Sequence, residues 1–147
     1  LYVYHKNKEE LLVSAYVEIK QNISQAILKD FHENQPIRDI MRQVWFSMFE
    51  YASNNLEYFK FAEQFANSPY SDQVDQEAVE QYFIPLINVV QKGIEQKIIK
   101  NVSLDLLGVF LFHPIARLAN PRLCIHGDFT EDDIEVAFSM AWDAIKL

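Results

Sequence analysis

Apolar residues return every three or four positions along almost the whole chain, and this spacing restricts the possible folds more than any other feature. Such a period places apolar side chains on one face of an α-helix, whereas a half-buried strand alternates at every second residue. The 147 residues contain only three glycines and five prolines, too few for the many turns of a β-sandwich or barrel. The sequence therefore predicts an all-α bundle of about six helices around one main core.

Turn-forming residues divide this pattern into separate helical stretches. We expect helices at residues 8–28, 37–52, 56–66, 79–100, 104–120 and 130–147. Asn7, Ser103 and Thr130 are the expected N-caps of three of them, because a short polar side chain there can accept a hydrogen bond from a free backbone N–H. Pro85 and Pro114 lie inside expected helices, where each removes one backbone hydrogen bond, so we expect a bend at both.

Charge and cysteine content exclude several classes of protein. The formal net charge is −8, and an acidic surface repels nucleic-acid phosphates, although residues 1–8 form a short basic segment with Lys6 and Lys8 and no acid. The single cysteine, Cys124, cannot form an internal disulfide, which fits a reducing cytoplasm. No apolar run reaches the roughly 18–20 residues that cross a bilayer, and no Cys/His cluster has zinc spacing. We expect no membrane partner, metal or cofactor.

Two short segments resemble motifs of one family of regulators. Residues 1–12 read LYVYHKNKEELL, which is similar to the end of the recognition helix and the start of the next helix in the TetR family; only His5 departs, at a position where the family usually has Phe. Residues 91–101, followed by the helix start at Ser103, resemble the family passage that leads into the first dimerisation helix.

The resemblance implies a division of the chain into two parts and a function for each part. It implies that the chain begins inside the DNA-reading helix, so that residues 1–7 are a remnant of the helix-turn-helix domain and residues 8–147 form the ligand-binding and dimerisation domain. By the same resemblance, Tyr2, Tyr4 and Lys8 are candidate contacts to DNA phosphates, which position a reading helix without specifying bases. The other interpretation is that the tyrosines are packing aromatics and the lysine a solvated charge.

The implied function is ligand-responsive transcription regulation in the cytoplasm. We expect a homodimeric repressor that binds operator DNA in the full-length protein and that a lipophilic small molecule releases. Such an inducer must bind the DNA-incompetent arrangement more tightly than the competent one. No enzymatic activity is expected, because no histidine has a Glu three residues before it, as di-iron bundles require, and the chain has no P-loop, dinucleotide fingerprint or nucleophile elbow.

Aromatic residues indicate where the ligand would bind. We place the pocket among the expected helices at 37–52, 56–66, 79–100 and 104–120, because large rings around bent helices leave gaps and ligand pockets are mostly apolar with a few polar groups. The candidate ligand-binding residues are Trp45, Phe46, Phe49, Phe61, Phe65, Tyr82, Phe83, Phe110, His113 and Arg117. The alternative interpretation is that most of these aromatics simply fill the core.

The last two expected helices carry more apolar surface than a small bundle can cover. Such surface predicts a two-fold dimer in which these helices form a four-helix bundle with those of a second copy. The candidate interface residues are Phe110, Pro114, Leu118, Phe138, Ala141 and Ile145. A helical hydrophobe or lipid carrier without DNA binding is the alternative; it predicts a monomer and leaves the N-terminal motif unexplained.

Overall fold

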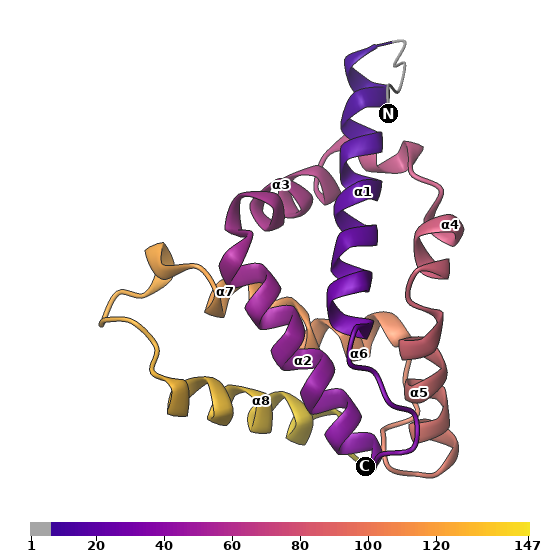
Figure 1. Cartoon of the computed structure of the whole chain (residues 1–147), viewed down its shortest axis with the longest axis vertical. Coiled ribbons are helices and arrows are strands. Elements are labelled where there is room, and N and C mark those ends of the chain that lie inside the picture. Colours follow the sequence, from indigo (N-terminus) through magenta and orange to yellow (C-terminus); the bar gives the residue numbers. More distant parts are fainter. Residues whose placement is uncertain (1–6) are drawn as a thin grey trace.

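All regular secondary structure in residues 7–147, the part of the chain that the computed structural model describes, is helical (Figure 1). The helices are α1 (Lys8–Leu28), α2 (Ile37–Asn54), α3 (Leu56–Ala66), α4 (Gln76–Gln81), α5 (Ile84–Glu95), α6 (Leu104–Leu111), α7 (His113–Leu118) and α8 (Glu131–Ile145). Two 3-10 turns, η1 (Pro69–Gln73) and η2 (Pro121–Leu123), lie between α3 and α4 and between α7 and α8. The prediction of an all-α fold is confirmed.

The long axis of the molecule is set by α1, which begins at the top of Figure 1, while α8 lies toward the bottom. Three predicted N-caps are confirmed by their hydrogen bonds. The side chains of Asn7, Ser103 and Thr130 each accept from the backbone N–H three residues later, at 2.9, 3.2 and 3.1 Å. Thr130 also donates its backbone N–H to Asp133, which completes a capping box. Local sequence therefore defines where these helices begin.

The expected helix at residues 79–100 is instead two helices, and it ends early. The break falls at Tyr82 and Phe83, directly before the first turn of α5, where Pro85 fits because its missing N–H would have no partner inside the helix. Downstream, Lys97 adopts a left-handed backbone conformation with φ of 60°. The chain then turns back, and the N–H groups of Ile98 and Ile99 both donate to the carbonyl of Gly93.

The prediction that this helix reaches Lys100 is wrong because residues 98–100 pair with the end of the chain. The backbone N–H of Lys100 donates to the carbonyl of Ile145 at 2.8 Å, and the N–H of Leu147 donates to the carbonyl of Ile98 at 2.9 Å. The extended pairing satisfies backbone groups that a helix would otherwise have used. It also joins the end of α8 to the loop after α5.

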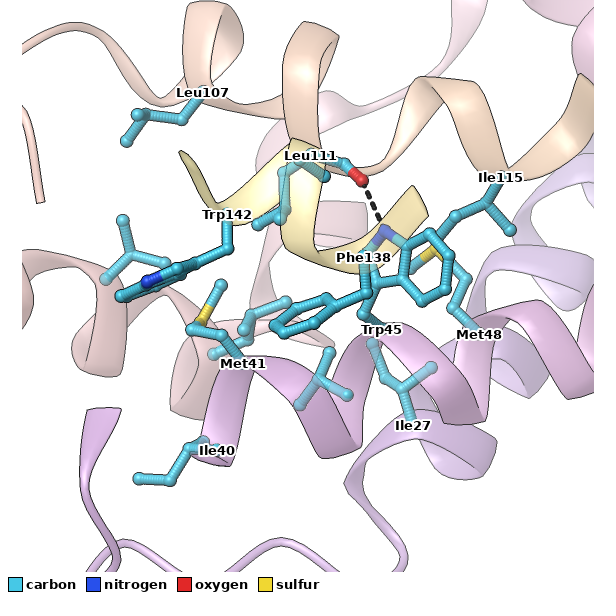
Figure 2. Close-up of a cluster of buried hydrophobic side chains, with 14 of the residues drawn as sticks. Ile27, Ile40, Met41, Trp45, Met48, Leu107, Leu111, Ile115, Phe138 and Trp142 are labelled. Carbon is cyan, nitrogen blue, oxygen red and sulfur yellow. Dashed lines mark hydrogen bonds between the residues drawn. The ribbon is translucent and has the colours of Figure 1, made fainter. Parts of the chain in front are cut away.

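The expected helix at residues 104–120 is broken by Pro114 into α6 and α7. In the break, the backbone N–H of Ile115 donates to the carbonyl of Phe112 at 3.1 Å, so the Leu111 carbonyl loses the partner that a continuous helix would supply. The indole N–H of Trp45 donates to this carbonyl at 2.8 Å (Figure 2). One side chain of α2 thus holds the bend between the two helices.

The main core lies between α1, α2, α5, α6, α7 and α8 (Figure 2). Trp45 and Phe138 are its largest fully buried side chains. A second, smaller cluster of Tyr16, Phe65, Val74 and Val79 joins α1 to α3 and α4. Burial of one large apolar side chain stabilises a fold by roughly 1.5–3 kcal/mol, so packing between the helices, more than helix propensity, stabilises this architecture.

Replacing Trp45 with Phe should lower stability more than the same change at Trp142. Both indoles are buried, but only that of Trp45 is hydrogen-bonded among the residues described. Loss of its N–H leaves the Leu111 carbonyl unpaired in the core, which costs about 1–3 kcal/mol. Chemical denaturation of Trp45→Phe and of the control Trp142→Phe measures the difference; equal losses in both variants would contradict this role of the indole.

Candidate functional site

The predicted ligand-binding residues do not surround a common pocket in the structure. Trp45, Phe46 and Phe49 pack into one aromatic group with Phe138 of α8, with ring centroids of Trp45 and Phe138 5.7 Å apart. The Arg42 guanidinium covers the outer side of this group, 4.5 Å from the Phe46 ring. These rings fill the space between α2 and α8.

Other members of the predicted set lie in different places. Phe61 and Phe65 belong to the packing between α1 and α3, where Phe65 stacks on Tyr16 at 4.6 Å, and Phe83 contacts both hydrophobic clusters. Tyr82 lines an open groove of about 430 Å³ along the C-terminal half of α1. Phe110 is 53% exposed on the outside of α6. The aromatic residues therefore have mainly packing contacts.

A cavity of about 230 Å³ does lie between α3, α7 and η2, and it includes two predicted residues, His113 and Arg117. Its other lining residues are Leu56, Phe59, Lys60, Glu63, Ala116, Asn120 and Leu123. Residues 56, 59, 60 and 63 follow the spacing i, i+3, i+4, i+7, and so do residues 113, 116, 117 and 120. One face of α3 thus meets one face of α7 and its C-terminal extension.

The charged groups of this cavity are Lys60, Glu63 and Arg117. The Lys60 ammonium is 3.7 Å from the carboxylate of Glu57, which is almost fully exposed, so this pair is loose. Within residues 7–147, neither the Arg117 guanidinium nor the Glu63 carboxylate has an ion pair or a side-chain hydrogen bond. Among the described residues, the cavity therefore offers one cation without a partner, Arg117, and a second, Lys60, that is only loosely paired.

Sequence reasoning missed Lys20, a half-buried cation on α1. Its ammonium lies 5.6 Å from the centre of the Tyr16 ring, and no carboxylate of the described chain pairs with it. Burial lowers the pKa of the Lys20 ammonium below its ordinary value of 10.5. On α2, the side-chain oxygen of Gln43 is buried without a hydrogen-bond partner. The Lys20 ammonium could donate a hydrogen bond to a ligand or water, and the Gln43 oxygen could accept one.

A row of exposed apolar side chains covers the outer side of α6 and α8. We call it the outer stripe; its members, each 46–67% exposed, are Leu106, Val109, Phe110, Val136 and Met140. The α6 residues follow i, i+3, i+4 spacing and the α8 residues i, i+4 spacing, so each set lies on one face of its helix. Because α6 packs directly against α8, the two sets lie on neighbouring helices.

The predicted interface residues divide between this surface and the core. Phe110 and Pro114 are exposed and Leu118 is half-buried. Phe138, Ala141 and Ile145 are at most 7% exposed, because they face α2 and α6 within one protomer. These three side chains are therefore covered mainly by the protomer's own helices.

The predicted DNA-contact residues lie at the N-terminal end of the chain. Lys8 is the exposed first residue of α1, while Tyr2 and Tyr4 are outside the described residues.

In residues 7–147 no group of three or more His, Cys, Asp or Glu side chains is arranged to hold a metal ion. No helix in that range is long and apolar enough to cross a membrane.

The comparisons with known proteins agree on one family. A family model described as the C-terminal domain of Tetracyclin repressor-like proteins matches residues 36–146. A solved TetR family transcription regulator from Marinobacter aquaeolei is 32% identical, with a TM-score of 0.85, and the match covers 99% of this chain and 76% of that one. No curated protein sequence matches the chain.

More distant solved structures share the fold. A TetR family protein from Vibrio parahaemolyticus has a TM-score of 0.81 at 21% identity, and it is matched over 98% of this chain and 78% of its own. A TetR-family transcriptional regulator from Haemophilus influenzae has a TM-score of 0.77 at 19% identity, over 99% of this chain and 76% of its own. The helical arrangement is thus retained while most side chains differ.

Replacing Lys20 with Met should raise the melting temperature by a few degrees. At neutral pH the folded protein partly buries this ammonium without an anionic partner among the described residues, and an apolar side chain of similar length removes that cost. The lowered pKa means that the folded protein binds fewer protons than the unfolded chain. Wild-type stability should therefore rise as pH increases from the lowered folded value toward 10.5, and the advantage of the variant should shrink.

The matched control is Lys29→Met, which changes an exposed lysine just after the same helix. Thermal denaturation followed by circular dichroism compares the two variants with the wild type. A lower melting temperature for Lys20→Met than for Lys29→Met would show that the ammonium is stabilised in the folded protein.

Proposed function

Because the chain belongs to the TetR family of transcriptional regulators, we propose that it is the ligand-binding and dimerisation part of a cytoplasmic repressor that a lipophilic small molecule releases from operator DNA. In this proposal, residues 1–7 complete the DNA-reading domain and residues 8–147 form the regulatory domain. Tyr2, Tyr4 and Lys8 would contact DNA phosphates. The observation that supports the proposal is the course of α1, from its exposed N-terminal end into the core.

The two halves of α1 have different surroundings. Near Lys8 the helix is exposed, whereas Ile19, Ile23 and Ile27 are buried among α2 and its neighbours. A ligand that changes the packing around the buried half of α1 would therefore also shift its N-terminal end. In the proposal, the DNA-reading domain is attached at that end. Such a ligand regulates DNA binding only to the extent that it binds the two arrangements with different affinity.

A second copy of the chain is the proposed occupant of the outer stripe. Contiguous exposed apolar surface of this kind usually marks an interaction site, and a two-fold axis lets one surface cover itself. The stripe lies on α6 and α8, the helices from which the sequence predicts a four-helix bundle across a dimer. The proposed interface keeps Phe110 and Pro114 from the predicted set and adds the other members of the outer stripe, Leu106, Val109, Val136 and Met140. A monomeric carrier would leave this surface unexplained.

A charge in the outer stripe should yield monomers. Met140→Glu and Phe110→Glu each place a carboxylate on a surface that the dimer would remove from water, so dimerisation should weaken at least about tenfold. Tyr58→Glu is the control, because Tyr58 on α3 is comparably exposed, at 57%, and lies outside the stripe. Analytical ultracentrifugation measures the mass of each variant. If both Met140→Glu and Phe110→Glu keep the mass of a dimer, the interface lies outside the outer stripe.

The regulatory proposal is tested with the full-length protein and its own promoter region. We expect tight operator binding in an electrophoretic mobility-shift assay, and release by a subset of lipophilic compounds at concentrations that leave an unrelated repressor bound. Absence of sequence-specific binding to the promoter region would contradict the proposed function.

A further inference from the structure

The cavity between α3 and α7 has a different chemical character from the aromatic core. Its walls combine apolar groups, chiefly Phe59 and Leu123, with the cations Lys60 and Arg117. Its one carboxylate is Glu63, so the lining carries a net positive charge, although the whole chain has a formal net charge of −8. A concave site of this composition favours a ligand with an apolar body and a negative end.

We propose that this cavity binds a small carboxylic acid with an apolar body. Arg117 is the group that recognises the acid: its guanidinium has no ion pair or hydrogen bond to the rest of residues 7–147 and can donate two parallel hydrogen bonds to one carboxylate. Lys60 adds a second positive charge from the facing helix, and its existing pair with Glu57 is too exposed to compete strongly.

The size of the cavity limits the ligand. A volume of about 230 Å³ is below the roughly 300–1,000 Å³ of pockets for drug-sized molecules, so the site suits an aromatic or short aliphatic acid. The ring of Phe59 and the side chains of Leu56 and Leu123 supply the apolar contacts. Glu63 opposes the acid, because like charges in one cavity repel.

The position of the cavity also links it to the core. His113 and Arg117 belong to α7, which begins directly after the break where Trp45 bonds the Leu111 carbonyl. An acid held against α7 would therefore contact the helix that directly follows this break. The proposal narrows the class of ligand in the proposed function to carboxylic acids. Binding of the acid does not depend on that function, but any effect of the acid on operator binding does.

The test uses two acids and their neutral counterparts: benzoate with benzamide, and hexanoate with hexanamide. Binding to the chain is followed by nuclear magnetic resonance, through the side-chain signals of its histidines. We expect saturable shifts of the His113 signals with the acids, little effect of the amides, and unchanged signals of the exposed His32 and His126, which do not line the cavity. Equal binding of acids and amides, or no saturable binding of either acid, would overturn the proposal.

Charge variants test the assigned residues. Arg117→Gln and Lys60→Gln should each weaken benzoate binding about fivefold, in line with partly solvated charge pairs. Glu63→Gln should strengthen it, because the opposing carboxylate is removed. Lys92→Gln, an exposed lysine of α5 outside the cavity, should leave the affinity unchanged. Wild-type affinity in Arg117→Gln would refute its role. These binding measurements contain no DNA, so their outcome is independent of whether the full-length protein binds operator DNA.

Discussion

The hydrogen bond from the Trp45 indole to the Leu111 carbonyl is the contact on which the surrounding arrangement depends. Pro114 prevents a continuous helix at this point, and the carbonyl left over is buried. A buried carbonyl without a partner costs about 1–3 kcal/mol, so the donor that α2 supplies stabilises the break. Sequence positions far apart, in α2 and at the end of α6, are thereby fixed relative to each other.

Because of the break, the short helices α6 and α7 direct their side chains toward different surfaces of the molecule. α6 packs against α8 and presents Leu106, Val109 and Phe110 outward, whereas α7 turns one face toward α3 and forms the cavity with His113 and Arg117. A straight helix could not direct both sets of side chains in this way, because its faces keep one register along its whole length. The proposed dimer surface, mainly on α6 and α8, and the proposed acid site, between α3 and α7, therefore share no residues.

Local features of the fold could be predicted from sequence, and long-range ones could not. The caps at Asn7, Ser103 and Thr130 depend on residues a few positions apart, so their patterns suffice. The end of α5 depends on pairing with the end of the chain, which no local pattern contains. In α8, apolar residues occur on two sides, so periodicity alone could not tell that Phe138 faces the core while Met140 faces outward. Sequence reasoning named His113 and Arg117 of the cavity but missed its α3 face, because that face mixes charged and apolar residues.

A crystal structure of the chain grown with benzoate tests the central claim most directly: one break in the chain creates both a self-association surface and a separate acid site. The account predicts a two-fold axis passing beside α6 and α8, with Met140 and Phe110 covered by the second copy. It also predicts benzoate between α3 and α7, with its carboxylate at Arg117. A dimer that leaves the outer stripe in solvent, or benzoate bound among the rings around Trp45, would contradict the account.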